Sequence, residues 1–319
     1  MRLLITGITG FVGSHLADLA LGMGWEVHGT IRVRSDRSNI AHLGDRIKLH
    51  ECELRDYVSV EAMLEETGRL DYLVHLAAQS FVGSSWLTPH YTVTNNICSQ
   101  INLLEAIRIG WETPPRIIIA GSSEEYGHVF EDELPLIESN PFRPLSPYAV
   151  SKVAQDVMGY QYWKSYGLPI IVARAFNHEG PRRGQPFVTS NFARQIALIE
   201  AGKQTPVVFV GNLEAVRDYT DVRDIVRGYA LLLEKGMPGE AYHLCSGVGW
   251  KISDVLATLV RLSFVQHIEI QVDPTRLRPS DVPILVGSAA KAKTAINWQP
   301  VIPFEKTLQD LLDYWRARV

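Results

Sequence analysis

The sequence has few cysteines, no excess of basic residues and no long unbroken apolar run. Its 319 residues include only Cys52, Cys98 and Cys245, which are too few and too scattered for a disulfide framework or a metal site. Such a chain suits a reducing, cytoplasmic compartment. The formal net charge of -4 argues against a nucleic-acid partner. No stretch reaches the roughly 18 apolar residues of a membrane span.

The N-terminal segment is apolar, but it lacks the pattern of a signal peptide. Gly7, Gly10 and Gly13 interrupt the apolar run, and His15 and Asp18 lie inside it. A signal peptide would instead show a short basic region, an unbroken apolar stretch and a small-residue cleavage site. We therefore expect a soluble chain, with no membrane partner, whose first residues belong to the fold.

The first part of the chain alternates short apolar runs with helical patterns. The expected strands cover residues 2–6, 25–31, 47–51, 72–76, 116–120 and 170–175. The expected helices between them cover residues 11–23, 58–66, 91–109 and 147–166. This alternation predicts an α/β fold with a Rossmann-like, doubly wound parallel sheet.

The pattern changes after about residue 176. Short polar segments now separate helices expected at residues 192–201, 222–233 and 253–262. We therefore divide the chain into a dinucleotide-binding domain, 1–175, and a part, 176–319, that mainly forms a smaller C-terminal lobe with some return to the sheet. Ligands of such sheets bind beyond the carboxyl ends of the strands, so the cleft between the two parts is the expected site.

A glycine-rich segment, GITGFVG at residues 7–13, follows the first expected strand and opens the first helix. Gly7 permits the tight turn, Gly10 lets the backbone approach a pyrophosphate, and Gly13 lets helix and strand pack closely. The free N–H groups at the start of the helix would bind the phosphates. The segment predicts a dinucleotide site.

The end of the second expected strand indicates which dinucleotide binds. NAD enzymes usually place an acid there for the ribose hydroxyl. This chain has Arg32 instead, and its first acid beyond that point is Asp36. A guanidinium pairs well with a phosphate, and Arg34, Ser35 and Arg37 are possible helpers. We therefore predict NADP rather than NAD.

Tyr148 and Lys152 lie four residues apart in an expected helix, so they share one face. A nearby ammonium group would stabilise the phenolate and lower the pKa of the tyrosine. The tyrosine could then exchange a proton with a sugar hydroxyl while hydride moves to or from a nicotinamide. The pair predicts redox chemistry at a carbon bearing oxygen.

Several further motifs accompany these residues along nearly the whole chain. They are LAAQ (76–79), Asn96, GSSEEYG (121–127), SPYAVSK (146–152), RAFNHEGPRRG (174–184), RDYTDVRD (217–224) and LRPSDVP (277–283). Together with the glycine segment they resemble the extended short-chain dehydrogenases/reductases of the nucleotide-sugar type, the NAD-dependent epimerase/dehydratase family. The resemblance implies an N-terminal cofactor domain and a sugar-nucleotide lobe.

The resemblance also implies roles for individual residues. The implied catalytic residues are Ser122, Glu124, Tyr148 and Lys152. The implied cofactor-binding residues are Gly7, Thr9, Gly10, Phe11, Val12, Gly13, Arg32, Glu53, Leu54, Leu76, Ala77, Ala78, Asn96, Tyr148 and Lys152. The implied substrate-binding residues are Ser85, Ser123, Asn177, Asn191, Arg217 and Arg278. Arg182 and Arg183 could add positive charge or form a surface turn, and we expect Glu125 to face outward. The ten histidines show no metal-binding spacing, so no metal is expected.

Two activities within this family compete. FNHEGPRRG followed by FVT, together with SPYAVSK, resembles GDP-mannose 4,6-dehydratase, whereas GSSEEYG, LRPSDVP and the modest length resemble GDP-4-keto-6-deoxymannose reductase. We predict a dehydratase that returns hydride through bound NADP, because Glu124 matches its extra acid/base. An NADPH-dependent reductase leading to GDP-rhamnose, or another nucleotide-sugar epimerase, stays an alternative. The implied partners are a GDP-hexose and further copies of the chain in a homodimer or homotetramer.

Overall fold

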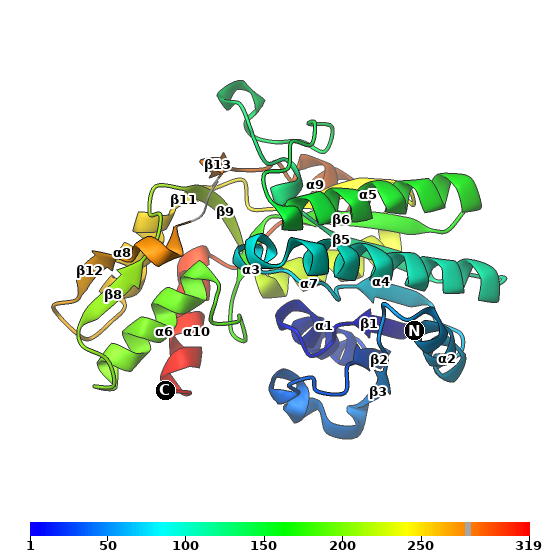
Figure 1. Cartoon of the computed structure of the whole chain (residues 1–319), viewed down its shortest axis with the longest axis horizontal. Coiled ribbons are helices and arrows are strands. Elements are labelled where there is room, and N and C mark those ends of the chain that lie inside the picture. Colours follow the sequence, from blue (N-terminus) through cyan, green and yellow to red (C-terminus); the bar gives the residue numbers. More distant parts are fainter. Residues whose placement is uncertain (278–281) are drawn as a thin grey trace.

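The computed structural model describes residues 1–277 and 282–319. Its larger half is built on a parallel sheet of seven strands in the order β3-β2-β1-β4-β5-β6-β10 (Figure 1). These strands are β1 (Arg2–Thr6), β2 (Glu26–Ile31), β3 (Ile47–Glu51), β4 (Tyr72–His75), β5 (Arg116–Ser122), β6 (Ile170–Ala175) and β10 (Ala241–Leu244). The predicted Rossmann-like fold class is confirmed.

Helices cover both faces of this sheet. One face packs against α1 (Phe11–Gly22), α7 (Val222–Lys235) and α9 (Ala290–Ile296). The other packs against α2 (Tyr57–Thr67), α4 (Pro89–Gly110) and α5 (Pro147–Tyr166), with the short α3 (Val82–Leu87) beside α4 and α5. Each face has its own apolar core, as a doubly wound sheet requires.

Local chemistry explains where these elements begin and end. Leu3, Leu4 and Ile5 of β1 are fully buried, which fits a central parallel strand covered on both faces. Helix α5 begins after Ser146, whose hydroxyl accepts from the amide of Ala149 at 3.1 Å. It ends at Gly167, which adopts a left-handed conformation with φ 73°.

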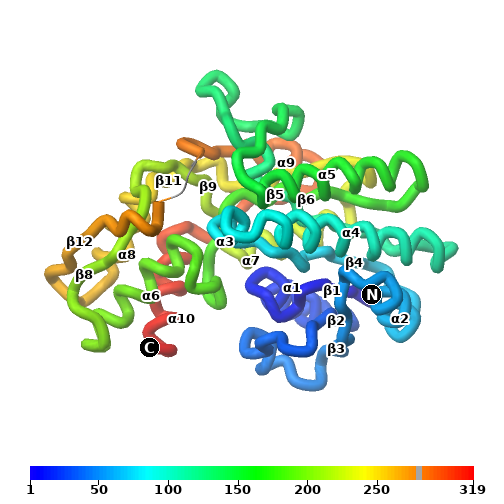
Figure 2. Tube along the Cα trace, in the orientation of Figure 1, coloured from blue at the N-terminus to red at the C-terminus, as the bar shows by residue number. Residues whose placement is uncertain are grey.

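The smaller lobe lies at the other end of the molecule and contains the C-terminus (Figures 1 and 2). Its helices are α6 (Val188–Glu200), α8 (Ile252–Arg261) and α10 (Phe304–Arg316), which enclose a third apolar core. Its short strands are β7 (Asn177–Glu179), β8 (Val207–Val210), β9 (Val216–Asp221), β11 (Gly249–Lys251), β12 (Glu269–Val272) and β13 (Ile284–Leu285). The pairing of β7 with β9 brings the chain after β6 alongside the lobe.

The two halves are interleaved in sequence. Strand β10 and helix α7 lie beyond residue 176, yet they belong to the sheet half. The expected helices at 192–201, 222–233 and 253–262 correspond to α6, α7 and α8, whereas α10 was not anticipated. No helix within the described residues is long and apolar enough to cross a membrane.

Candidate active site

A cavity of about 1140 Å³ lies where the carboxyl ends of the sheet strands face the lobe. Its wall takes residues from β2, β5, β6 and the turns after β1 and β4 on the sheet side, and from β7, α6 and β9 on the lobe side. Ligand sites for single small molecules are commonly about 300–1,000 Å³. This cavity is therefore large enough for two ligands that meet inside it.

The glycine turn after β1 forms one end of the cavity. Gly7 adopts φ 71°, and the amide of Gly10 donates to the Gly7 carbonyl at 3.0 Å. A Cβ at position 13 would lie 2.5 Å from the Gly7 carbonyl oxygen, so only glycine fits there. Helix α1 begins after Gly10 with no side-chain cap, which leaves its first N–H groups for a ligand anion. All six predicted cofactor residues of this turn line the cavity: Gly7, Thr9, Gly10, Phe11, Val12 and Gly13.

The ends of β2, β3 and β4 continue this wall. The predicted residues there, Arg32, Glu53, Leu54, Leu76, Ala77 and Ala78, all line the cavity. Arg32 is exposed, its amide donates to the Ser35 hydroxyl at 2.9 Å, and Ser35 also lines the wall. Arg34 and Arg37 lie outside the wall. A cation beside a hydroxyl at this point suits a ribose phosphate.

Two predicted contact residues, Asn96 and Ser85, lie one layer behind the wall. Asn96 is fully buried; it accepts from the Gln79 amide at 2.8 Å and donates to the Ser151 hydroxyl at 2.9 Å. It therefore braces the segment after β4 against α5. Ser85 is also fully buried, and its hydroxyl donates to the Val82 carbonyl at 2.7 Å. In this structure both residues support the wall rather than form it.

The predicted triad converges on the middle of the cavity. Ser122 ends β5, and Tyr148 and Lys152 occupy the first turns of α5. Ser122 is hydrogen-bonded to the Tyr148 side chain. The Lys152 ammonium donates to the Ala120 carbonyl at 2.8 Å and lies 6.0 Å from the centre of the Tyr148 ring. The four catalytic residues predicted from the sequence all line the cavity, with Glu124 beside Ser122.

The electrostatics of this group differ from the sequence prediction. Burial raises the pKa of Tyr148 above its ordinary value, and the hydrogen bond from Ser122 only partly opposes this. Burial also lowers the pKa of Lys152 to about 8. The predicted lowering of the Tyr148 pKa is therefore wrong, because desolvation of the phenolate dominates and the charges of Glu124 and Glu125 act in the same direction.

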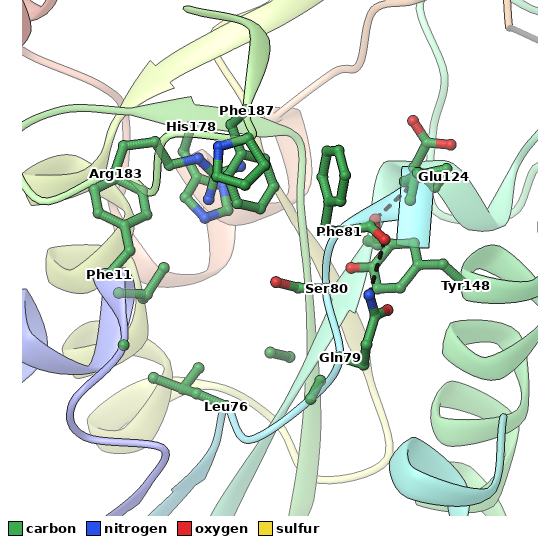
Figure 3. A pocket seen from close by; sticks show the side chains of 18 of the residues that line it. Phe11, Leu76, Gln79, Ser80, Phe81, Glu124, Tyr148, His178, Arg183 and Phe187 are labelled. Atoms are coloured by element: carbon green, nitrogen blue, oxygen red, sulfur yellow. Dashed lines mark hydrogen bonds between the residues drawn. The ribbon is translucent and has the colours of Figure 1, made fainter. Parts of the chain in front are cut away.

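The two adjacent glutamates face different surroundings. Glu124 lines the cavity, and Figure 3 shows its carboxylate pointing away from the Tyr148 ring. Glu125 is completely buried, and the amide of Ser122 donates to its Oε1 at 2.6 Å. The expectation that Glu125 faces outward is wrong, because it turns into the protein to cap the short 3-10 turn η2 (Ser123–Glu125).

The lobe side contributes several of the predicted substrate residues. Asn177, Asn191 and Arg217 line the cavity from the lobe, with Arg217 buried on β9, whereas Ser123 lines it from the turn after β5 on the sheet side. The amide oxygen of Asn191 accepts from the Arg276 guanidinium at 2.7 Å, so Arg276 also reaches this wall. The predicted residue Arg278 lies outside the described residues.

A cluster opposite Tyr148 combines Phe11, a predicted cofactor residue, with side chains to which the sequence assigned no definite role. Figure 3 shows Arg183, Phe187, His178 and Phe11 together across the cavity. The Arg183 guanidinium carbon lies 3.5 Å from the centre of the Phe187 ring and 4.9 Å from that of Phe11. Arg183, for which a surface turn seemed equally plausible, is therefore part of the site. The only sequence signal for its location was the RAFNHEGPRRG motif that carries it.

Glu179 on β7 adjoins this cluster through Arg183 and was likewise given no role by the sequence. Its Oε1 lies 3.7 Å from Arg183 Nε, and its carboxyl group is buried at the cavity wall. Burial raises the pKa of Glu179 to about 7, although the charge of Arg183 acts in the opposite direction.

Among the described residues no cluster of His, Cys, Asp or Glu could hold a metal ion.

Comparison with known proteins identifies the family. The family model described as GDP-mannose 4,6 dehydratase matches residues 4–311. The chain belongs to this family. GDP-mannose 4,6 dehydratase 2 of Arabidopsis thaliana is 36% identical over 97% of this chain and 85% of its own length. GDP-6-deoxy-D-mannose reductase of Pseudomonas aeruginosa is 34% identical over 100% of this chain and 98% of its own length.

Solved structures show the same relationship in the fold. RMD from Pseudomonas aeruginosa, solved in complex with NADPH, matches with a TM-score of 0.86 and 31% identity over 100% of this chain and 99% of that chain. The UDP-glucose 4-epimerase of Thermus thermophilus, solved with NAD, matches with a TM-score of 0.87 and 31% identity over the whole length of both chains. The fold is thus shared by dehydratases, reductases and epimerases of nucleotide sugars.

Proposed function

We propose that this protein is a GDP-mannose 4,6-dehydratase that uses bound NADP as an internal redox cofactor. The observation that carries the proposal is the position of Glu124, which lines the cavity beside Ser122 and Tyr148. A simple ketone reduction needs only the phenolic proton, whereas a 4,6-elimination needs a further acid/base. Glu124 supplies that group from a short turn whose backbone is fixed by the Ser122 hydroxyl at 3.2 Å.

The residues divide the reaction between them. NADP supplies a reversible hydride acceptor when it is bound. Tyr148 exchanges the proton of the C4 hydroxyl, and Ser122 orients the phenol through their hydrogen bond. Glu124 then removes the C5 proton and protonates the departing C6 hydroxyl, so that water is lost and no group changes its net charge. Arg217 and Asn177 bind the charged, polar part of the nucleotide sugar on the lobe side.

For NADP, the fit rests on the uncapped start of α1 and on Arg32 at the end of β2. The relative RMD, solved with NADPH, is consistent with that choice. We expect NADPH to bind more tightly than NADH, and Arg32→Asp to remove most of this preference, a change of about tenfold for one charge-assisted contact. Titration of both cofactors tests the assignment, and equal affinities in the wild type would refute it.

A second function, reduction of a GDP-4-keto-6-deoxy sugar by NADPH, has its own support. The Pseudomonas aeruginosa reductase matches this chain over 98% of its length, compared with 85% for the Arabidopsis dehydratase. In addition, the Glu124 carboxylate must rotate toward the cavity centre before it can act on C5 (Figure 3). Both functions use Ser122, Tyr148 and Lys152, so only the role of Glu124 separates them.

One pair of reactions decides between these functions. The purified protein is incubated with GDP-mannose and no added nicotinamide, and loss of water is followed by mass. A dehydratase forms the product, and Glu124→Gln then stalls with NADPH absorbance persisting, because the variant keeps Tyr148 but lacks the proton-transfer group. A reductase leaves GDP-mannose unchanged, oxidises free NADPH with the 4-keto sugar, and loses little rate in Glu124→Gln. Dehydration by Glu124→Gln at the wild-type rate would contradict the role given to this carboxylate.

The remaining sequence predictions concern assembly and location. We propose a homodimer or homotetramer in the cytoplasm, on the basis of the family resemblance and the absence of a disulfide framework. Light scattering of the purified protein tests the oligomeric state directly.

A further inference from the structure

A buried carboxyl group that the proposed reaction does not use lies directly behind Ser122. Glu125 is fully buried, and its Oε1 accepts from the Ser122 amide at 2.6 Å. The Ser122 hydroxyl in turn accepts from the Glu124 amide at 3.2 Å, so the two residues close a reciprocal capping box. Through this box, Glu125 fixes the backbone on which both Ser122 and Glu124 stand.

Glu125 also belongs to a charged cluster between β6 and α5. The Arg174 guanidinium from β6 donates to Asp156 at 2.7 and 3.1 Å, to the Tyr126 hydroxyl at 2.9 Å and to the Glu138 carbonyl at 2.7 Å. Its Nε lies 3.5 Å from Glu125 Oε2, too far for a second strong bond. Two buried carboxyl groups thus face one guanidinium, whose hydrogen bonds go to Asp156, Tyr126 and the Glu138 carbonyl rather than to Glu125.

The number of protons in this cluster follows from its geometry. Glu125 Oε2 is buried and receives no hydrogen bond from the described residues, yet Asp156 is close enough for the two carboxyl groups to hydrogen-bond. A proton placed between them gives Oε2 a partner and leaves one negative charge against one guanidinium. Two neighbouring carboxylates in a dry site do not both ionise. Burial and the charge of Asp156 raise the pKa of Glu125 well above its ordinary value, in agreement with this count.

The cluster is connected to the catalytic residues along one helix face. Tyr148, Lys152 and Asp156 are spaced four residues apart on α5, so Asp156 extends the catalytic face by one turn. A negative charge on Glu125 raises the pKa of both Tyr148 and Lys152. Further titratable groups around this cluster are Tyr126, His243 of β10, which is hydrogen-bonded to the Tyr126 hydroxyl, and Glu138, whose carboxylate accepts from the His243 amide at 2.8 Å.

We propose that Glu125 is a positioning residue of the active site that acts as a neutral acid, shares one proton with Asp156 and holds Ser122 in place without adding a charge behind Tyr148 and Lys152. The inference rests on the proposed function in one respect, the transfer of a proton by Tyr148. The proton shared by Glu125 and Asp156 exists whichever sugar is the substrate.

The shared proton can be observed without any substrate. In the protein with NADP, infrared spectroscopy at neutral pH should show the carbonyl stretch of a protonated carboxylic acid, which moves in heavy water and is distinct from the Glu179 band that Glu179→Gln removes. Glu125→Gln should remove the former band. The control Glu131→Gln, which alters an exposed glutamate six residues further along the chain, should leave it unchanged. Absence of the band from the wild type, or its persistence in Glu125→Gln, would overturn the proposal.

The positioning role is tested by turnover on whichever of the two sugars the wild type accepts. Glu125→Ala should lower kcat by about 100-fold, the scale of a small misplacement of reacting groups, with NADPH affinity retained. Glu125→Gln keeps the acceptor for Ser122 and a donor toward Asp156, so it should recover kcat to within about threefold of wild type. A glutamine variant as impaired as the alanine variant would mean that Glu125 must be ionised, contrary to the proposal.

A pH profile separates this role from simple structural support. Asp156→Asn leaves Glu125 as the sole acid beside Arg174, so Glu125 should ionise and raise the pKa of Tyr148 and Lys152. The alkaline limb of the kcat profile should then move upward by roughly one pH unit. An unmoved limb would overturn the charge argument. If the wild type turns over neither sugar, the proposed function fails, whereas the infrared result still decides the state of Glu125.

Discussion

The two halves of the cavity differ in whether backbone or side chains form their walls. The cofactor half is formed largely by main chain, at the turn where Gly7, Gly10 and Gly13 bring β1 and α1 together. The substrate half is formed by charged and aromatic side chains, among them Arg183 and Arg217 from separate segments. The shape of the cofactor half is therefore set by the backbone, whereas the shape of the substrate half depends on which partners its long side chains contact.

Both halves leave some buried polar atoms of the wall without a hydrogen-bond partner. Within the described residues, these include Gln79 Oε1 and Trp86 Nε1 on the sheet side and Arg183 Nε on the lobe side. Buried polar groups are normally paired, and a group of exceptions at a cavity wall indicates that a polar ligand supplies the partners. The comparison teaches that the two halves differ in what forms them, main chain in the cofactor half and long side chains in the substrate half, while both present polar atoms to a ligand.

The largest expected effect comes from the residue where the two halves meet. Tyr148→Phe removes the proton that passes between the sugar and the protein, so turnover should fall by about 10²–10⁴-fold. NADPH affinity, which depends on the backbone half, should change little. Steady-state kinetics together with cofactor titration would show this separation, and near-normal turnover would mean that the triad is misassigned.

Breaking the backbone half should affect the cofactor first. In Gly13→Ala the new Cβ meets the Gly7 carbonyl oxygen at 2.5 Å and Ile8 Cα at 2.9 Å, and both are backbone atoms that move only with the turn. We expect NADPH affinity to fall by about 100-fold or the protein to lose stability by a few kcal/mol. The matched control is Gly22→Ala in the same helix, where no atom lies within 4 Å of the new Cβ. Equal behaviour of the two variants would contradict the role of close approach at Gly13.

The smallest expected effect is on the pH dependence of stability, to which the buried Glu179 carboxyl group of the substrate half contributes. The pKa of Glu179 is about 7 in the folded protein and near 4.5 when unfolded, so the folded state binds the extra proton between these values. The contribution of Glu179 to the free energy of unfolding should therefore decrease by about 1–3 kcal/mol as pH rises from about 5 to 7, opposite in sign to the contribution of the buried histidines. Glu179→Gln removes this contribution, so its stability should rise relative to that of the wild type over the same pH range. Urea unfolding of both proteins without ligands at pH 5 and pH 8 measures the difference, and identical slopes would place the Glu179 pKa at its ordinary value.

The sequence was sufficient wherever function depends on local backbone geometry. The strand, the three glycines and the helix after them are contiguous, so their spacing alone predicts the turn that the structure shows. Tyr148 and Lys152 were predictable for the same reason, because a helix places residues four apart on one face. The six strands of the first domain followed from short buried apolar runs.

The tertiary structure alone decided which polar side chains are buried and what they face. Glu125, expected to face outward as the second of two adjacent acids, lies inside because β6 brings Arg174 and α5 brings Asp156 to the same point. Glu179 and Arg183 reach the cavity because β7 pairs with β9 and turns the chain back across the sheet. Whether a charge can be buried depends on partners from distant segments, and that pairing is set by the packing of the whole chain rather than by any local pattern.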